Sequence, residues 1–374
     1  MELAACYIVR NEAKELDKSI HSLINAVDEL VVVDTGSEDA TIDIARSYRA
    51  RIFSFPWQNH FAKARNFALS KVKSPWIIFL DADEYFLHPK RIRPALLDLL
   101  EGQPDADAVM LVRHNIDTGR EENHLPYDVS LRILRNAPEL RYRGRIHEML
   151  QKNGDTPNLL YAKEGLSLVH TGYSSEVNKR KIRRNLALLN AEIAEEGKTP
   201  SHDMYLSECY FSLGDYRRAL LHAMEALCSD LLVISDQGSL YHIAIESMRQ
   251  LNMPPEYMLA LARAAIQDLP DLPEFYGEQG MILCGMGRLE KARRSLETAM
   301  DIYDRGKVNY RQGSYFTDSV AAIVCKRLGE IHRIRGDAES CQHWLKRALE
   351  LDKKNPEIQA LCRDFRKQFP QNPL

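Results

Sequence analysis

Short apolar runs alternate with helix-patterned segments through the first 170 residues of the chain. The apolar runs predict strands at residues 3–9, 29–33, 51–55 and 76–80. The segments between them carry apolar residues at helical spacing and predict helices at residues 16–25, 41–48 and 61–71. Because these strands are continuously apolar rather than alternating, we expect a parallel sheet covered by helices on both faces.

The strand pattern disappears from about residue 178 onward, and self-similar helical segments replace it. Gly214, Gly287 and Gly336 fall at predicted turns between helices, and small residues follow each of them where two helices would cross closely. This is the pattern of tetratricopeptide repeats, which have a period of about 34 residues. A generic helical bundle is the alternative. We expect three parts: an α/β domain at 1–177, a helical connector at 178–199 and repeats at 200–374.

Composition excludes some classes of protein. The chain has 374 residues, of which 45% are hydrophobic and 28% charged, with a formal net charge of -3. No basic excess suggests nucleic-acid binding, and no apolar run approaches the roughly 18 residues of a membrane span. The N-terminal residues do not read as a signal peptide, and the seven cysteines are scattered without a CxxC pair. We therefore expect reduced, buried thiols and a cytoplasmic location.

Two acidic clusters follow predicted strands. Asp34 ends the second strand and precedes a turn with Gly36, while Asp81 and Asp83 follow the fourth strand directly. Ligands of parallel sheets bind beyond the carboxyl ends of the strands, and paired carboxylates suit Mg²⁺ or Mn²⁺ shared with a diphosphate. The alternative is that these residues only form turns and helix caps.

Several motifs occur in register with this pattern. They are IVRNEA (8–13), ELVVVDTGSEDAT (29–41), FAKARNFAL (61–69), WIIFLDADE (76–84), RILRN (132–136), RYRGRIHEML (141–150), HTGY (170–173) and KRKIRRNLALL (179–189). Together they resemble family-2 inverting glycosyltransferases, specifically the bacterial branch with an appended tetratricopeptide region. The resemblance implies a GT-A nucleotide-sugar-binding α/β domain followed by an all-α tetratricopeptide-like superhelical domain.

The resemblance also implies residues that bind the donor, a UDP-sugar. Asp34 resembles the aspartate that reads the base, and Asn11 and Glu12 resemble the loop that lines the nucleotide. Arg65 and Asn66 resemble the arginine–asparagine pair near the ribose and diphosphate, although Arg65 could equally be a surface charge or part of a helix cap.

The metal site that the family implies would hold Mn²⁺ or Mg²⁺. Asp81 and Asp83 resemble its aspartate motif, Asp83 as the direct ligand, and Asp81 would also face the donor. His170 resembles a late histidine that completes the site in several GT-A enzymes, whereas a lone histidine is more often structural.

An inverting reaction needs a base that deprotonates the acceptor. We predict that Glu148, next to His147, has this role; the alternative is a salt bridge to Arg141, Arg143 or Arg145. These arginines and Arg132 are predicted to form a basic cluster that could bind phosphate or an anionic acceptor, or a solvated face.

The predicted reaction is transfer of a hexose or N-acetylhexosamine from a UDP-sugar to an acceptor. Tetratricopeptide arrays form concave surfaces suited to extended peptides, which favours a peptide or protein acceptor. The alternatives are a cell-envelope saccharide or lipid-linked glycan, with the repeats as scaffold or homodimer contact, and a non-catalytic scaffold. A nucleotidyltransferase would show a glycine-rich loop after the first strand, where this chain has Arg10, Asn11 and Glu12.

Overall fold

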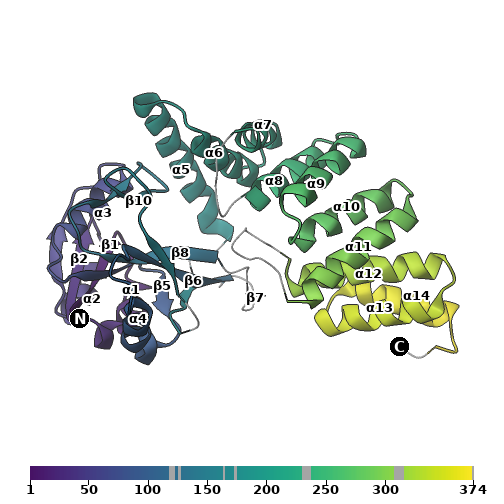
Figure 1. Cartoon of the computed structure of the whole chain (residues 1–374), viewed down its shortest axis with the longest axis horizontal. Coiled ribbons are helices and arrows are strands. Elements are labelled where there is room, and N and C mark those ends of the chain that lie inside the picture. The colour runs from purple at the N-terminus through teal and green to yellow at the C-terminus, as the bar shows by residue number, and fades with distance from the viewer. Residues whose placement is uncertain are drawn as a thin grey trace. The chain divides into compact units, whose positions relative to one another are not determined.

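The computed structural model describes residues 1–117, 123–124, 128–162, 165–171, 175–229, 237–306 and 316–372. Gly172 and Tyr173 of the HTGY motif lie outside the described residues. The chain divides into two compact units, Met1–Lys198 and Thr199–Leu374 (Figure 1). Across the described residues, no helix combines the length and the apolar character that crossing a membrane requires. All seven cysteines are free; contrary to the expectation of burial, Cys228 is exposed.

A single large sheet forms the centre of the first unit. Its first part has the order β3-β2-β1-β4 with all four strands parallel, as the sequence predicts. The bounds are β1 (Leu3–Val9), β2 (Glu29–Asp34), β3 (Arg51–Ser54) and β4 (Trp76–Leu80). The sheet continues as β8-β6-β12-β5, in which β8 runs antiparallel to both β4 and β6. The sheet is therefore mixed, and the expectation of a purely parallel sheet is correct only for its first half.

The later strands contribute polar residues to the same sheet. Their bounds are β5 (Glu84–Phe86), β6 (Ala108–Asp117), β7 (Asn123–His124), β8 (Asp128–Arg135), β11 (Leu159–Tyr161) and β12 (Leu168–His170). β12 pairs with both β5 and β6 and so places His170 opposite Glu84 and Asn115. Charged and polar side chains interrupt the two longest of these strands: β8 carries Asp128, Arg132 and Arg135, and the apolar start of β6 is followed by Arg113 and Asn115.

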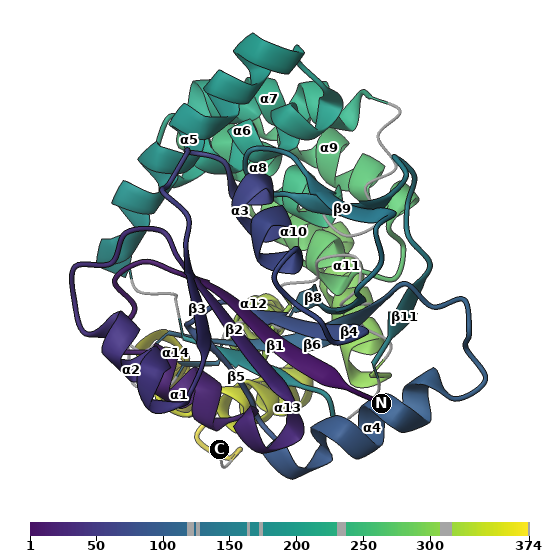
Figure 2. The same ribbon diagram turned by 90° about the vertical axis from the view of Figure 1, so that its left-hand side faces the viewer.

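Helices cover both faces of the sheet, and the side chains of β4 alternate between the two cores. Ile78 and Leu80 pack with α1 (Leu16–His21), α2 (Thr41–Ser47) and α4 (Ile92–Leu100). Ile77 and Phe79 pack on the opposite face, which is covered by α3 (Phe61–Leu69) and the hairpin of β9 (Leu140–Arg143) and β10 (Met149–Lys152) (Figure 2). Two 3-10 turns, η1 (Ile24–Ala26) and η2 (Pro89–Arg91), and the long α5 (Ser175–Glu196) complete this unit.

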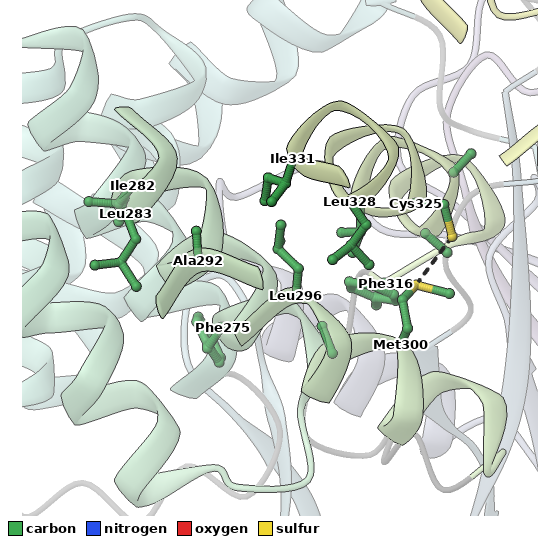
Figure 3. Close-up of a cluster of buried hydrophobic side chains, with 14 of the residues drawn as sticks. Phe275, Ile282, Leu283, Ala292, Leu296, Met300, Phe316, Cys325, Leu328 and Ile331 are labelled. Carbon is green, nitrogen blue, oxygen red and sulfur yellow. Dashed lines mark hydrogen bonds between the residues drawn. The ribbon is translucent and has the colours of Figure 1, made fainter. Parts of the chain in front are cut away.

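The second unit is built from antiparallel helix pairs. The described helices are α6 (Pro200–Ser212), α7 (Tyr216–Leu227), α8 (Gln237–Gln250), α9 (Pro255–Asp268), α10 (Pro273–Gly285), α11 (Leu289–Asp304), α12 (Asp318–Ile334), α13 (Ala338–Leu351) and α14 (Pro356–Gln368). Successive helices pack on each other and bury a continuous apolar core, part of which Figure 3 shows around Phe275, Leu296 and Leu328. This arrangement agrees with the predicted repeats.

The turns between paired helices need residues with a left-handed backbone. Gly214, Gly287 and Gly336 have φ values of 78°, 70° and 74°, as their predicted positions require. The pair α8–α9 turns instead at Asn252, which has φ of 52°. Asparagine is the residue after glycine that best tolerates this conformation, so the glycine pattern alone misses this copy. At the crossing of α10 and α11, a Cβ on Gly280 would lie 2.5 Å from Leu296.

Candidate active site

The predicted acidic residues lie at one edge of the sheet. Asp34 ends β2 opposite Val9 of β1, and Asp81 follows β4, whose Leu80 pairs with Tyr7 of β1. Because β1 lies between β2 and β4 and neighbouring strands are about 4.8 Å apart, the two aspartate backbones are roughly 10 Å from each other across the edge. That distance can be spanned by one extended ligand.

The loop after β1 is fastened to the loop after β2. The backbone N–H of Asn11 donates to Ser37 Oγ at 3.0 Å, and the N–H of Glu12 donates to Thr41 Oγ1 at 2.7 Å. The side-chain oxygen of Asn11 accepts from the N–H of Glu38 at 2.8 Å, and Asn11 itself has φ of 57°. The two loops therefore form one polar rim beside Asp34. Within this rim, the Asn11 side chain binds the backbone N–H of Glu38.

Asp34 belongs to the turn that begins this rim. Its Oδ1 accepts a hydrogen bond from the backbone N–H of Ser37 at 3.0 Å, and the Thr35 hydroxyl donates to the carbonyl of Val9 at 3.1 Å. The predicted alternative, an Asx turn, is thus present. The turn also fixes the half-buried Asp34 carboxylate at the sheet edge.

A network of buried charges lies behind Asp81. Arg132 donates from Nη2 to Asp81 Oδ2 at 2.7 Å, and from Nε to Glu84 Oε2 at 2.6 Å. Glu84 has no exposed surface and also accepts from Arg113 Nη1 at 3.0 Å. Buried charges of this kind are stable only when each is paired, and here each guanidinium has a carboxylate partner. Arg132 belongs to this network, whereas Arg145 binds Asn59 and Glu195. Contrary to the prediction from the sequence, Arg132 is therefore not part of a basic cluster with the arginines of the hairpin.

Arg65 extends the network to Glu148. Its Nε donates to Glu148 Oε1 and its Nη2 to Asp81 Oδ1 at 3.2 Å. The guanidinium lies 4.6 Å from the ring centroid of Phe79 and 5.3 Å from that of Tyr142. The predicted alternative for Glu148 named the arginines of its own hairpin, but its partner is Arg65, 83 positions away. Arg65 is buried and so is neither a surface charge nor a cap.

The network sets the charge of its members. Burial acts to raise the pKa of the Asp81 carboxyl, but the charges of Arg132 and Arg65 outweigh it and hold the pKa well below its ordinary value. At the rim, burial and the nearby charge of Asp83 raise the pKa of Glu12 to about 7. Beside Glu148, burial lowers the pKa of His147 to about 4, so this imidazole is neutral at pH 7.

Asp83 and His170 face each other at the same edge. The His170 Nε2 lies 3.4 Å from Asp83 Oδ2, and its Nδ1 lies 3.0 Å from Asn115 Oδ1. The Asn115 amide is oriented by Asp128, which accepts from its Nδ2 at 3.2 Å. A neutral His170 therefore carries its proton on Nδ1 and directs the Nε2 lone pair at a carboxylate.

The pairing of Asp83 with His170 bears on whether the site suits a divalent cation. The lone pair of His170 Nε2 and the Asp83 carboxylate repel each other unless a cation or a proton lies between them. A histidine that donates its other N–H to a fixed oxygen is the usual form of a metal ligand. Among the described residues, no group of three or more His, Cys, Asp or Glu side chains gathers to hold a metal. Asp83 and His170 thus fit a cation that takes its other ligands from substrate oxygens and water.

Asn66 has a different position from the other predicted donor-binding residues. Its Nδ2 donates to the carbonyl of Tyr142 and its Oδ1 accepts from the N–H of Tyr142, both at 2.9 Å. Asn66 therefore fastens the β9–β10 hairpin to α3. Beneath that hairpin is a cavity of about 370 Å³, lined by Arg65, Arg132 and Glu148 among other residues.

Sequence reasoning missed four residues that hold the site together. Glu84, Arg113, Asn115 and Asp128 connect Arg132 to His170. Glu84 is visible as the last letter of WIIFLDADE, but its partners come from β6 and β8, whose register places Arg113 opposite Asp128. That register depends on tertiary pairing and has no local signal.

Comparison with known proteins shows what the first unit is similar to. Residues 5–168 match the model of glycosyl transferase family 2. The TPR repeat-containing protein Synpcc7942_0270 of Synechococcus elongatus is 35% identical over 151 residues, 40% of this chain and 35% of that protein. Glycosyltransferase SunS of Bacillus subtilis is 29% identical over 205 residues, 52% of this chain and 45% of that protein. The chain thus spans less than half the length of these two relatives.

A third relative is matched over most of its length. The lipopolysaccharide core biosynthesis glycosyltransferase LpsC of Rhizobium meliloti is 26% identical over 257 residues, 64% of this chain and 92% of that protein. Among solved structures, the TPR protein YrrB covers 50% of this chain and 86% of its own, with 16% identity and a TM-score of 0.39. Glucosyl-3-phosphoglycerate synthase of Mycobacterium tuberculosis, in complex with Mn²⁺ and UDP-glucose, covers 32% and 44%, with 24% identity and a TM-score of 0.26.

Proposed function

We propose that the chain transfers a hexose or N-acetylhexosamine from a UDP-sugar to an acceptor with inversion, because residues 5–168 match the model of glycosyl transferase family 2. The observation that carries this proposal is the Asp83–His170 pair, which lies at the same sheet edge as Asp34 and is held by Asn115 and Asp128. The contact with Asn115 directs Nε2 of a neutral His170 toward Asp83, where a cation would bind both side chains.

Asp34 and the rim after β1 are the proposed nucleotide-binding residues. The carboxylate of Asp34 would accept from the uracil N–H, and the fastened loop with Asn11 and Glu12 would lie along the nucleoside. The hydrogen bonds between the two loops support this role because they fix the rim before a ligand arrives, which lowers the entropy that binding costs.

Asp83 and His170 are the proposed ligands of Mn²⁺ or Mg²⁺. When bound, such an ion neutralises the charge that develops on a departing diphosphate. Asp81 is engaged by Arg132 and Arg65, so we assign it to orienting these guanidinium groups beside the diphosphate rather than to direct coordination.

Glu148 is the proposed base. It lines the cavity beneath the β9–β10 hairpin, and it accepts from Arg65, whose other nitrogen contacts Asp81. An acceptor hydroxyl or thiol in this cavity would give its proton to Glu148 as it attacks the sugar carbon, while the bond to the diphosphate breaks on the opposite face.

Two acceptor classes follow from different observations. The LpsC relative acts in lipopolysaccharide core biosynthesis and is matched over 92% of its length, which supports a saccharide or lipid-linked glycan. The stacked helix pairs of the second unit support a peptide or protein acceptor, since such arrays bind extended peptides. The same repeats could instead join two copies of the chain.

A donor screen tests the proposal. The protein is incubated with Mn²⁺ and a panel of UDP- and GDP-sugars, and nucleotide release is measured with and without EDTA. We expect metal-dependent release from a UDP-sugar. Asp83→Asn should weaken the apparent Mn²⁺ affinity by at least 10- to 100-fold, the range already found for residues that only support metal ligands.

Asp98→Asn is the matched control, because Asp98 is exposed on α4 and remote from the sheet edge. It should leave the Mn²⁺ dependence unchanged. Absence of metal-dependent binding or hydrolysis with every donor, or equal behaviour of the two variants, would contradict the proposed function.

A further inference from the structure

The turn that carries Glu148 has an unusual backbone. Between β9 and β10, Gly144 has φ of 99° and His147 has φ of 52°, so two left-handed residues occur within four positions. A Cβ on Gly144 would meet the carbonyl oxygen of Ile146 at 3.3 Å and the Cα of Glu148 at 3.5 Å. Such conformations persist only where surrounding contacts enforce them.

Glu192 of α5 supplies one of these contacts. Its Oε2 accepts the backbone N–H of Arg145 at 2.8 Å, directly inside the turn. A Cβ on Gly144 would lie 3.7 Å from the other oxygen, Oε1, so the carboxylate covers the start of the turn. Glu192 is buried, with 9% of its surface exposed. A buried carboxylate on a backbone N–H is a strong, charge-assisted bond.

The other side of the same turn is held by the segment before α3. The N–H of Phe61 donates to the carbonyl of Arg145 at 2.8 Å. The Arg145 side chain donates from Nη1 to the carbonyl of Asn59 at 3.1 Å and from Nη2 to Glu195, a second residue of α5. Both backbone groups of Arg145 and its side chain are thus fixed by elements far away in the sequence.

We propose that Glu192 is a positioning residue for Glu148. By holding the N–H of Arg145, it keeps the turn in the left-handed form that directs Glu148 to Arg65 and to the cavity. This role rests on the proposed function of Glu148 as the base. It gives α5, which holds Arg145 through Glu192 and Glu195 near its C-terminal end, a part in transfer.

Three variants of α5 test the proposal. Glu192→Ala removes the acceptor of the Arg145 N–H, and we expect kcat of transfer to fall about 10- to 100-fold, the loss typical of a displaced catalytic group. The KM for the donor should stay within about threefold, because the donor-binding rim lies on other loops. Glu192→Gln keeps an oxygen at this place and should recover most of kcat, while the exposed Glu196→Ala should match the wild type.

Hydrogen exchange provides a readout that needs no activity. Amides of the 144–148 peptide should exchange at least about tenfold faster in Glu192→Ala than in Glu192→Gln or Glu196→Ala, with unchanged exchange in β1 and β4. Unchanged kcat together with unchanged exchange in Glu192→Ala would overturn the proposal, as would an equal loss in the Gln and Ala variants. If the wild type transfers no sugar, the proposed function fails, and the exchange rates alone decide whether Glu192 fixes the turn.

Discussion

The two units of the chain differ in how deeply their ion pairs are buried. In the first unit, arginines pair with carboxylates that are far away in sequence and buried, such as Arg132 with Glu84 at a separation of 48 and Arg65 with Glu148 at a separation of 83. In the second unit, many pairs connect residues three or four positions apart on one helix surface. Examples are Arg293 with Glu290 and Glu297.

This difference separates a site from a scaffold. Removing charges from water costs more than most ion pairs return, so buried pairs are a poor means of stabilising a domain. The repeat unit obtains its stability from close apolar packing, as at Gly280, where a Cβ would lie 2.5 Å from Leu296. The first unit keeps the buried charges of Arg65, Glu84 and Arg132 beside the proposed reaction site.

The first prediction removes chemistry and leaves packing in place. Glu148→Gln keeps the shape of the side chain and an oxygen for Arg65, but it cannot take a proton. We expect kcat of transfer to fall about 10³-fold, within the range for general base catalysis. Nucleotide release in the presence of acceptor measures kcat, and the KM for the donor should change less than about threefold.

The control for this experiment is Glu101→Gln, an exposed residue at the end of α4. It should behave as the wild type in both parameters. A Glu148→Gln enzyme that turns over within threefold of the wild type would remove Glu148 from the chemistry and leave only its ion pair with Arg65.

The second prediction concerns the stability of the buried network. The fully buried Glu84 has two guanidinium partners, Arg132 and Arg113, and Arg132→Met removes the first of them. We expect the free energy of unfolding of the first unit to fall by about 3 to 5 kcal/mol, the cost of breaking a buried pair from one side. Urea unfolding followed by Trp57 and Trp76 fluorescence, in a Trp344→Phe background, reports on this unit alone.

Acid should act on the same network. The folded pKa of Asp81 is depressed, so its contribution to stability is full above the unfolded value of about 3.8 and is lost as the pH falls below it. Arg132→Met should move this loss to higher pH. Arg46→Met, at an exposed pair with Asp43, is the control. Equal unfolding free energies for the two variants would show that the buried Arg132 network does not stabilise the first unit more than an exposed ion pair does.

Much of the fold is readable from local pattern. The strands β1 to β4 appear at the predicted residues because continuous apolar runs mark them, and Asp34 and Asp81 fall at their ends. The α8–α9 turn is hidden because Asn252 takes the place of glycine. The antiparallel strand β8 is hidden because its register depends on strands from other parts of the chain.

The candidate site is predictable as a set of residues but not as a network. Asp83 and His170 resemble family positions, and they lie 3.4 Å apart. Nothing local shows that Glu148 pairs with Arg65 or that Asn66 binds the backbone of Tyr142. These contacts join segments more than 70 positions apart and arise only when the β9–β10 hairpin packs on α3. The metal, the donor sugar and the domain boundaries remain predictions.

The last prediction has the smallest effect and sharpens the comparison between the units. Arg293→Met removes two ion pairs of α11, at 2.6 Å to Glu290 and 2.7 Å to Glu297. Both carboxylates are more than a third solvent-exposed, at 47% and 35%, so water already solvates them. We therefore expect the free energy of unfolding to fall by only about 0.5 kcal/mol. Unfolding followed by circular dichroism at the helix band measures this loss of free energy, which 1 M NaCl should abolish. A salt-insensitive loss as large as that of Arg132→Met would mean that burial does not distinguish the charges of the two units.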